Sequence, residues 1–286
     1  MKELCIGLMS GTSLDGVDAA LVEFGDDGLR VRGHAYRAFE RELADELLAL
    51  NTPGENEIHR GALAANALVR VYAQAVADVL DASATARSDV RAIGAHGQTV
   101  RHRPREFDGT GYTIQLNSPA LLAELTGIDV VADLRGRDVA AGGQGAPLAP
   151  AFHRAVFGRA DATVAVLNLG GIGNLTVLAR DGSTIGFDCG TGNVLMDHWC
   201  QRHTGRAFDA GGAWADTGRV DAALLAQLLA EPYLALPVPK STGRDLFNAA
   251  WLQAQLQRTA APLRAEDVQA TLAEFTAAAA AADVLR

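Results

Sequence analysis

The sequence has few cysteines, few aromatic residues and no long apolar run, and each shortage excludes a class of protein. Only three cysteines are present, Cys5, Cys189 and Cys200, and their spacing matches no metal-binding motif. An odd number of cysteines favours a reducing compartment. No apolar run reaches the roughly 18 residues that a membrane-spanning helix requires. Because the first three residues lead straight into an expected strand, without a secretory signal, we expect a soluble, cytoplasmic protein with no membrane partner.

Positive charge is also scarce. The chain has 25 Lys and Arg against 34 Asp and Glu, a formal net charge of −9, and no basic stripe. This balance argues against a nucleic-acid partner. With 286 residues, 49% of them hydrophobic and only 6% aromatic, the chain can bury a large core of Ala, Leu and Val in one large or two small domains.

Two familiar nucleotide-binding motifs are missing. There is no Walker A pattern, and the dinucleotide fingerprint requires a Gly-rich turn that opens a helix. The residues that follow Gly11 and Gly173 do not open a helix. A nucleotide site in this chain therefore needs a different arrangement.

The first eighteen residues provide such an arrangement, because a polar turn joins two expected strands. Leu4–Met9 is an apolar run, Ser10–Gly16 is the turn, and Val17–Phe24 reads as the second strand. Gly11 and Gly16 allow positive φ and close backbone approach. A turn of this shape can cradle phosphate, although an ordinary polar hairpin loop is the alternative.

The side chains of this turn suit a phosphate with its metal. The N–H groups and hydroxyls of Thr12 and Ser13 can point at an anion. Asp15 and Asp18 are close enough to hold Mg²⁺ directly or through water.

A second strand–turn–strand unit follows in the middle of the chain. Thr163–Leu169 and Leu175–Ala179 read as strands around the turn Gly170–Asn174. The order of elements repeats that at the N-terminus, although the letters do not. Two phosphate-binding hairpins that face each other across a cleft would grip a nucleoside triphosphate from both sides.

Asp188 ends the next expected strand and precedes an expected helix over 194–203. An aspartate with an ordinary pKa of about 3.9 is ionised at neutral pH and can accept a proton. We interpret Asp188 as a general base, with a capping or Mg²⁺–water role as the alternative. Its neighbour Cys189 reads as a packing residue, since no adjacent group is placed to activate the thiol.

Three further residues carry open alternatives. His96, after the expected strand Val90–Ala95, could bond a sugar hydroxyl or phosphate, or simply satisfy a backbone carbonyl. Arg137, beside a Gly-rich loop, could form a bidentate bond to a carboxylate or phosphate, or a weak surface pair with Asp. Lys240 is a candidate contact to ATP or substrate, or a solvated lysine.

The chain resembles the anhydro-N-acetylmuramic acid kinase family of the sugar kinase, Hsp70 and actin superfamily. The stretches that carry the resemblance are GLMSGTSLDGVD, GAHGQTVRH, LNLGGIGN, GFDCGTGNVLMD, PKSTGRDLFN and the long segment 115–153. The resemblance implies a two-lobed α/β, ribonuclease H-like fold with mixed sheets flanked by helices. It places the N-terminal lobe at 1–160 and a second, incomplete lobe at 161–286.

The resemblance also implies an activity. Members use ATP and Mg²⁺ to open the anhydro ring of 1,6-anhydro-N-acetylmuramic acid by hydrolysis and phosphorylate it to N-acetylmuramic acid 6-phosphate, in peptidoglycan recycling. The catalytic base falls on Asp188 and the metal on Asp15. The sugar contacts expected in the matching stretches are His96, Gln98, Arg137 and Asn193. The expected ATP contacts are Gly11, Thr12, Ser13, Leu14, Asp15, Gly16, Val17, Asp18, Gly170 and Gly171.

The sequence departs from the family pattern at several points. Gly136 stands where a longer basic run is usual, and Thr191 where Pro is common. Family members continue past the position of Arg286 with a Gly-rich segment that holds the adenosine. The resemblance therefore predicts a truncated kinase or, as the alternative, a non-catalytic sugar-binding remnant. A homodimer is plausible because many sugar kinases of this kind pair.

Overall fold

The computed structural model describes residues 2–11, 13–26, 28–243 and 246–285. The chain divides into two compact units, Met1–Leu148 and Ala149–Arg286. The division lies earlier than the predicted boundary at 160/161. Helix α5 (Ala149–Phe157) thus belongs to the second unit, where its His153 Nδ1 lies 2.9 Å from Thr176 Oγ1.

Unit 1 is built on a five-stranded mixed sheet with the strand order β3-β2-β1-β4-β7. Strands β1, β2 and β3 form an antiparallel meander, whereas β4 pairs parallel to β1 and β7 parallel to β4. The apolar run Ile128–Ala132 predicts a strand, of which only Val130–Val131 forms one. The strands are β1 (Glu3–Met9), β2 (Gly16–Gly25), β3 (Gly28–Ala38), β4 (Val90–Ala95) and β7 (Val130–Val131).

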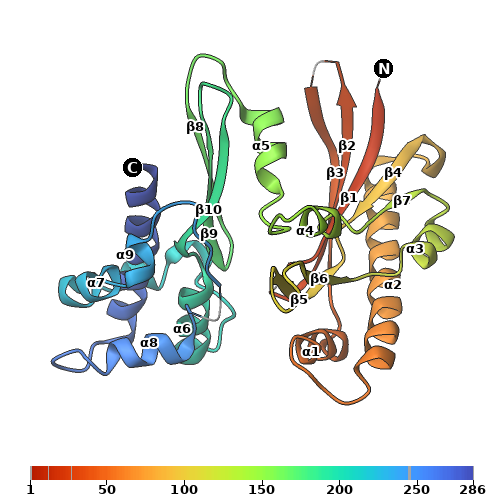
Figure 1. The fold of residues 1–286 in the computed structure, drawn as a ribbon. Helices are drawn as coiled ribbons and strands as arrows, with labels where there is room; N and C mark the ends of the chain where they lie inside the picture. The colour runs from red at the N-terminus through yellow and green to blue at the C-terminus, as the bar shows by residue number, and fades with distance from the viewer. Residues whose placement is uncertain (1, 12, 27, 244–245, 286) are drawn as a thin grey trace. The chain divides into compact units, whose positions relative to one another are not determined.

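One long helix, α2 (Glu57–Ser83), packs against this sheet (Figure 1). Apolar residues recur at steps of three and four from Glu57 to Leu80, a spacing that predicts a helix there. The side chains that α2 buries include Leu68, Tyr72 and Val79. The rest of unit 1 comprises α1 (Arg41–Ala49), the 3₁₀ turn η1 (Arg87–Asp89), the hairpin β5 (Gln98–Pro104) and β6 (Gly111–Leu116), α3 (Pro119–Thr126) and α4 (Gly136–Ala140).

Helix α2 is also long and apolar enough, by length and composition, to cross a membrane. Half of its most apolar window is buried inside the protein, however. Leu68, Val69 and Tyr72 are fully enclosed in the core of unit 1. The core of a globular domain therefore accounts for the apolar character of α2.

Unit 2 contains a three-stranded antiparallel sheet in the order β10-β9-β8. Its strands are β8 (Val164–Leu169), β9 (Ile172–Leu178) and β10 (Thr184–Thr191). Thr163–Leu169 reads in the sequence as a buried strand, but most residues of β8 are exposed, because α9 packs against β9 and β10. The hairpin turn predicted at Asp181-Gly182 joins β9 and β10.

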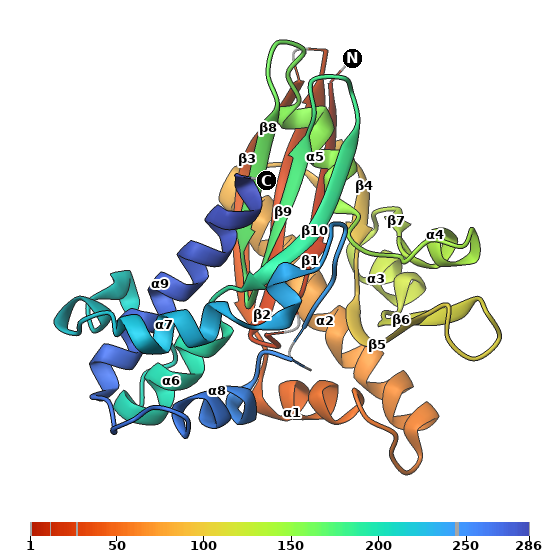
Figure 2. The ribbon, with the colours of Figure 1, turned by 60° about the vertical axis from the view of Figure 1, so that its left-hand side comes forward.

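The helices of unit 2 gather around α9 (Ala265–Val284), which packs against β9 and β10 (Figure 2). Phe247, Leu272 and Phe275 are fully buried at the centre of this core. Helix α8 starts at Ala249, because the side chain of Asn248 caps it by accepting from Trp251 N. The other elements are α6 (Val194–Thr204), η2 (Ala210–Gly212), η3 (Ala215–Thr217), α7 (Ala222–Leu229) and η4 (Pro232–Ala235).

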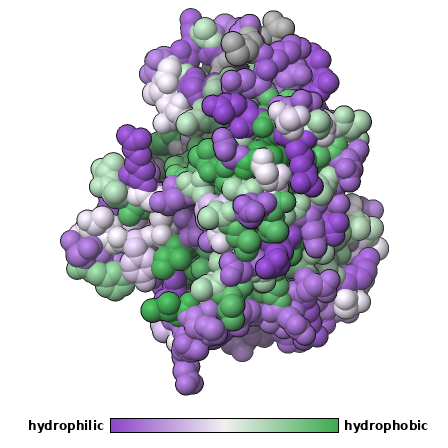
Figure 3. All heavy atoms as spheres, turned by 90° about the vertical axis from the view of Figure 1, so that its right-hand side faces the viewer, coloured by the Kyte–Doolittle hydropathy of each residue, from purple (hydrophilic) through white to green (hydrophobic). Residues whose placement is uncertain are grey.

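The surface is mixed in character. The view in Figure 3 shows hydrophilic and apolar residues interleaved on one face of the molecule. Single exposed apolar side chains of this kind are normal on a folded protein.

Candidate active site

The polar turn of unit 1 lies between β1 and β2 and is held from two other elements. Ser10 Oγ lies 2.7 Å from the hydroxyl of the buried Tyr72 on α2. Gln98 Nε2 donates to the carbonyl of Gly11 over 3.1 Å. The amide of Gln98 is buried, and its Oε1 has no partner among the described residues. Gln98 is therefore placed to fix the turn.

The far side of the turn is held by β3 and the residue that follows it. The carbonyl of Asp15 accepts from Tyr36 Oη and from Phe39 N, both over 2.9 Å. Gly16 has no room for a side chain, because a Cβ would lie 2.2 Å from the carbonyl oxygen of Arg37. The close approach of the β3 backbone to Gly16 therefore explains why this residue is a glycine.

The positive φ expected at Gly11 and Gly16 is found at neither residue. Leu14 instead has the left-handed conformation, with φ of 60°. A non-glycine residue in this region costs free energy and is more frequent at functional sites. The N–H groups of Ser13 and Asp15 donate to no described residue, and backbone N–H groups in such a turn can bind an anion.

The side chains of the turn separate into groups with different surroundings. Ser13 Oγ donates to Asp15 Oδ1 over 2.6 Å on an exposed surface. Asp18 instead points to β3, where its Oδ1 lies 2.9 Å from His34 Nε2. Val17 is fully buried in the core, and its backbone is paired with Arg37 of β3. Thr12 lies outside the described residues.

Metal ligands are few in this region. Among the described residues, no group of three or more His, Cys, Asp or Glu side chains could hold a metal ion. Asp15 is exposed beside the turn and not tied to a cation. A single carboxylate of this kind fits Mg²⁺ that keeps most of its water and is also bound by phosphates.

A second polar cluster of unit 1 surrounds Arg135. Its Nε donates to His96 Nε2 over 2.8 Å, and its Nη1 donates to the carbonyl of Gly145 over 2.6 Å. His96 Nδ1 lies 2.6 Å from the carbonyl of Gly97. These two bonds require a neutral ring protonated on Nδ1, and burial followed by the charge of Arg135 lowers the pKa of His96. His96 therefore satisfies a backbone carbonyl, the second of its predicted alternatives, and orients Arg135.

Arg135 and Arg137 differ in environment. Arg137 is exposed, and its side chain bonds no described residue. Arg135 is half-buried, and burial lowers the pKa of its guanidinium because no carboxylate among the described residues compensates the charge. The sequence did not single out Arg135. The signal that could have identified it is its position shortly after the end of a strand, at Val131.

The second Gly-rich turn, in unit 2, joins β8 and β9 and rests on the start of α6. The carbonyl of Gly171 accepts from Gly192 N over 2.9 Å and from Val194 N over 3.1 Å. The carbonyl of Gly170 accepts from Asn193 N over 2.8 Å. Both carbonyls are used, and the N–H groups of the two glycines have no acceptor among the described residues. Backbone N–H groups of this kind can bind an anion.

Asn193 closes this arrangement. Its Nδ2 donates to the carbonyl of Leu169 at the end of β8, over 2.9 Å. The sequence predicted that the Asn193 side chain contacts the sugar. In the structure this side chain, one residue before α6, holds the start of α6 to the end of β8. Asn193 is half-buried, and its amide oxygen accepts from no described residue.

Asp188 does not end β10, as the sequence predicted, because the strand continues to Thr191. Instead the ladder with β9 is interrupted between Asp188 and Gly190, which makes Cys189 the extra residue of a β-bulge. Bulges redirect side chains and are frequent beside active sites. The thiol of Cys189 is buried, and burial raises its pKa to about 11, so it is a packing residue.

The carboxylate of Asp188 is half-buried and held on one side only. Its Oδ2 accepts from Ser241 Oγ and from Thr242 N, both over 3.0 Å. Its Oδ1 accepts from no described residue. Burial raises the pKa of Asp188 above its ordinary value, and the two donors oppose this rise.

Lys240 fits neither of its predicted surroundings. The side chain is 2% exposed, so it is not solvated. Its Nζ donates to the carbonyl of Leu234 over 2.9 Å and lies 3.0 Å from Asp283 Oδ2. The ammonium group is therefore occupied within unit 2.

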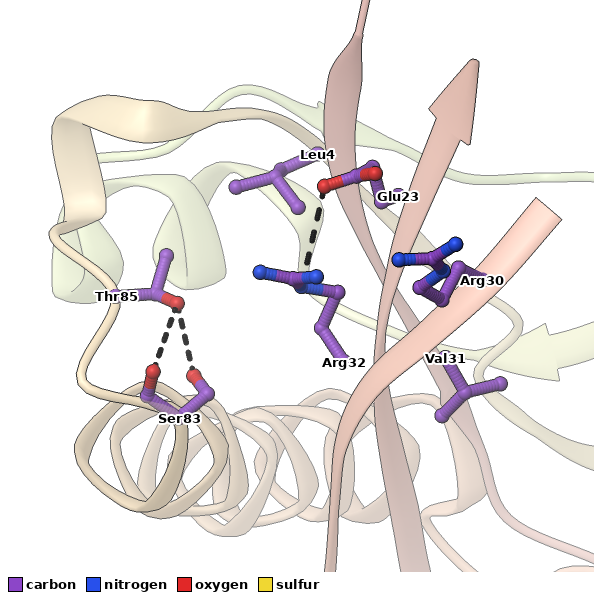
Figure 4. A pocket seen from close by; sticks show the side chains of 7 residues that line it. All are labelled: Leu4, Glu23, Arg30, Val31, Arg32, Ser83 and Thr85. Atoms are coloured by element: carbon purple, nitrogen blue, oxygen red, sulfur yellow. Dashed lines mark hydrogen bonds and ion pairs between the residues drawn. The ribbon is translucent and has the colours of Figure 1, made fainter. Parts of the chain in front are cut away.

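A cavity of about 260 Å³ in unit 1 lies apart from these residues (Figure 4). It is lined by Glu23, Arg30 and Arg32 at the end of the β1–β2 hairpin that is opposite to the polar turn. Glu23 lies 3.8 Å from Arg32 and 3.0 Å from Lys2. This carboxylate offsets part of the local positive charge.

These observations define a class of protein. Mixed sheets flanked by helices, with a polar turn in each of two units and a strand-borne aspartate, are typical of the sugar kinase, Hsp70 and actin superfamily. A sequence model described as "Anhydro-N-acetylmuramic acid kinase" matches residues 3–286. The chain belongs to this family, which confirms the predicted family and fold class.

Curated relatives carry the same name. The chain is 63% identical over 291 residues to "Anhydro-N-acetylmuramic acid kinase" of Variovorax paradoxus, covering 99% of this chain and 77% of that protein. The protein of that name from Albidiferax ferrireducens is 59% identical, with 100% and 78% covered. A solved structure, ethanolamine utilization protein EutJ from Carboxydothermus hydrogenoformans, covers 96% of this chain and 89% of that one with 10% identity and a TM-score of 0.37, a likeness too low to support a conclusion.

Proposed function

We propose that this protein is an ATP-dependent kinase that opens the anhydro ring of 1,6-anhydro-N-acetylmuramic acid and phosphorylates the sugar. The product is N-acetylmuramic acid 6-phosphate, and the reaction belongs to cytoplasmic peptidoglycan recycling. Family membership over residues 3–286 supports the reaction. The geometry at Asp188 is the observation that carries the mechanism, because one carboxylate oxygen is held by two donors and the other accepts from none of the described residues.

In this mechanism Asp188 is the general base. Its open Oδ1 takes a proton from water, and the water oxygen forms a bond to the anomeric carbon of the sugar. The bond from that carbon to O6 breaks, and O6 attacks the γ-phosphorus of ATP. The bond from this phosphorus to the bridging oxygen breaks and ADP leaves. Burial favours this base because a raised pKa strengthens its affinity for the proton.

The two polar turns are the proposed phosphate sites. In unit 1 the N–H groups of Ser13 and Asp15 face no described acceptor, and in unit 2 the same holds for Gly170 and Gly171. Phosphoryl transfer depends mostly on positioning and charge neutralisation, which such donors supply. Asp15 would hold Mg²⁺ directly or through water, and the bound ion would neutralise phosphate charge.

The reaction itself is tested by a phosphosugar assay on the complete product of the gene. We expect ATP and the anhydro sugar to give one 6-phosphosugar for each ADP. ATP hydrolysis that leaves the sugar unphosphorylated would contradict the proposal.

We also propose that Arg135 binds the carboxylate of the sugar acid. A half-buried guanidinium without a carboxylate partner among the described residues is suited to an anionic ligand. Arg135→Met should raise the KM for the anhydro sugar by roughly 10- to 100-fold, since hydrogen bonds to charged groups contribute about 1.5–3 kcal/mol. Steady-state kinetics with varied sugar measures this.

Arg137→Met is the matched control, two positions along the same chain segment. Arg137 is exposed and bonds no described residue. We therefore expect the KM of Arg137→Met for the anhydro sugar to stay within about twofold of wild type. Removal of the acid group from the anhydro sugar should weaken its binding to wild type. The same removal should not weaken binding to Arg135→Met, because this variant has already lost the contact. A larger effect of Arg137→Met would move the carboxylate site to Arg137.

A further inference from the structure

Lys240 is one of only two lysines in the chain, and its side chain is almost completely buried. The Nζ atom contacts the carbonyl of Leu234 and the carboxylate of Asp283, on η4 and α9. It also lies 5.2 Å from the ring centre of Tyr233. A buried ion pair gains little net stability after its desolvation is counted. Stability alone therefore does not explain why this ion pair is buried here.

The main chain of Asp188 is bonded on both sides to this cluster. Asp188 N donates to the carbonyl of Lys240 over 2.9 Å. The hydroxyl of Tyr233, whose ring lies under the Lys240 ammonium, donates to the carbonyl of Asp188 over 2.7 Å. The bulged part of β10 is thus attached to the segment that Lys240 anchors.

The carboxylate of Asp188 is bonded to the same segment. Ser241 and Thr242, which give the two hydrogen bonds to Oδ2, directly follow Lys240 in the chain. The backbone from Lys240 to Thr242 is therefore fixed at its start by the buried ammonium and at its end by the catalytic carboxylate. A shift of Lys240 must displace both donors.

We propose that Lys240 and Asp283 are positioning residues, which hold the 240–242 segment so that Ser241 and Thr242 aim the open oxygen of Asp188. This inference rests on the proposed role of Asp188 as the base. Lys240 is not a ligand-binding lysine, because its Nζ is enclosed and already bonded. The pair acts through the segment and touches no reacting atom.

The positioning role predicts a change in pH dependence. The titratable groups around Asp188 are Tyr233 on η4, Cys189 on β10, Asp283 on α9 and Lys240 itself. Burial raises the pKa of Asp188, and the donors from Ser241 and Thr242 hold it down. Loss of these donors should raise this pKa further. Because the base must be deprotonated, activity should then be lost at a higher pH on the acid side.

The test compares three variants of the complete gene product. Lys240→Met should lower kcat by about tenfold or more, with the KM for sugar within about threefold, because misplacement of a catalytic group acts mainly on the chemical step. The acid limb of the kcat profile should move upward by roughly half a pH unit or more. Lys2→Met, at the other lysine, is the control, since Lys2 is exposed and pairs with Glu23.

The double variant Lys240→Met with Asp283→Leu separates positioning from stability. An apolar pair should restore thermal stability, as replacement of buried ion pairs often does, while kcat stays low and the acid limb stays shifted. Recovery of kcat together with stability would overturn the inference. So would a Lys240→Met enzyme with the kcat and pH profile of Lys2→Met.

Amide exchange provides a readout that does not need activity. The Thr242 N–H is bonded to Asp188 in the wild-type protein, so its exchange should be at least about tenfold faster in Lys240→Met than in Lys2→Met. If wild type fails to phosphorylate the sugar, the proposed function fails but this exchange still decides whether Lys240 anchors the segment. Equal exchange in the two variants would refute the anchoring.

Discussion

Asp188→Asn should lower the kcat for phosphosugar formation by roughly 10²–10⁴-fold, the range expected when a general base is removed. Asparagine has the same shape, and its amide oxygen can still accept from Ser241 Oγ and Thr242 N, as Oδ2 does now. The amide cannot take a proton from water, so the chemical step is lost while binding is kept. Steady-state kinetics and a melting curve of the same preparation measure both quantities.

Asp181→Asn is the matched control for this prediction. Asp181 is an exposed aspartate on the β9–β10 hairpin, and its Oδ1 accepts from Ser183 N over 2.8 Å, which an amide oxygen can also do. We expect kcat within about twofold of wild type. Turnover by Asp188→Asn equal to that of Asp181→Asn would eliminate the proposed base.

Local patterns were sufficient for much of the fold. The helix expected over residues 57–80 is α2, because its apolar spacing is set by sequence neighbours. Both strand–turn–strand units also appear where they were expected, since apolar strands and Gly-rich turns are local signals. The family resemblance rested on the same stretches and is confirmed over residues 3–286.

The details of the candidate site depended on contacts between distant residues. Lys240 lies in a loop and its partner Asp283 is 43 residues away on α9, so no local pattern could show that Lys240 is buried. Arg135 and Arg137 are two positions apart and do not share a side of their helical segment, but the sequence does not say which one is enclosed. The bulge at Cys189 likewise depends on the register with β9.

Gly192 is another position where packing, not local sequence, decides the residue. A Cβ there would lie 2.2 Å from the carbonyl oxygen of Gly170, which is backbone and cannot rotate away. Gly192→Ala should therefore separate the β8–β9 turn from the start of α6 and break the bonds from Gly192 N and Asn193 N. We expect the free energy of unfolding of unit 2 to fall by roughly 2–4 kcal/mol, at the upper end for an overpacked site. Denaturant titration measures this loss.

The effect should reach function as well, because the same turn presents the N–H groups of Gly170 and Gly171 that are proposed to bind phosphate. Gly171→Ala is the matched control, since its Cβ would meet only Val194 Cβ at 3.8 Å, an ordinary contact. We expect this variant to change the free energy of unfolding by less than about 1 kcal/mol. A Gly192→Ala protein as stable as Gly171→Ala would show that the turn does not rest on α6 as the hydrogen bonds indicate. If the prediction holds, the KM for ATP should also rise in Gly192→Ala at temperatures where the protein is still folded, because the two donors would no longer be held in place.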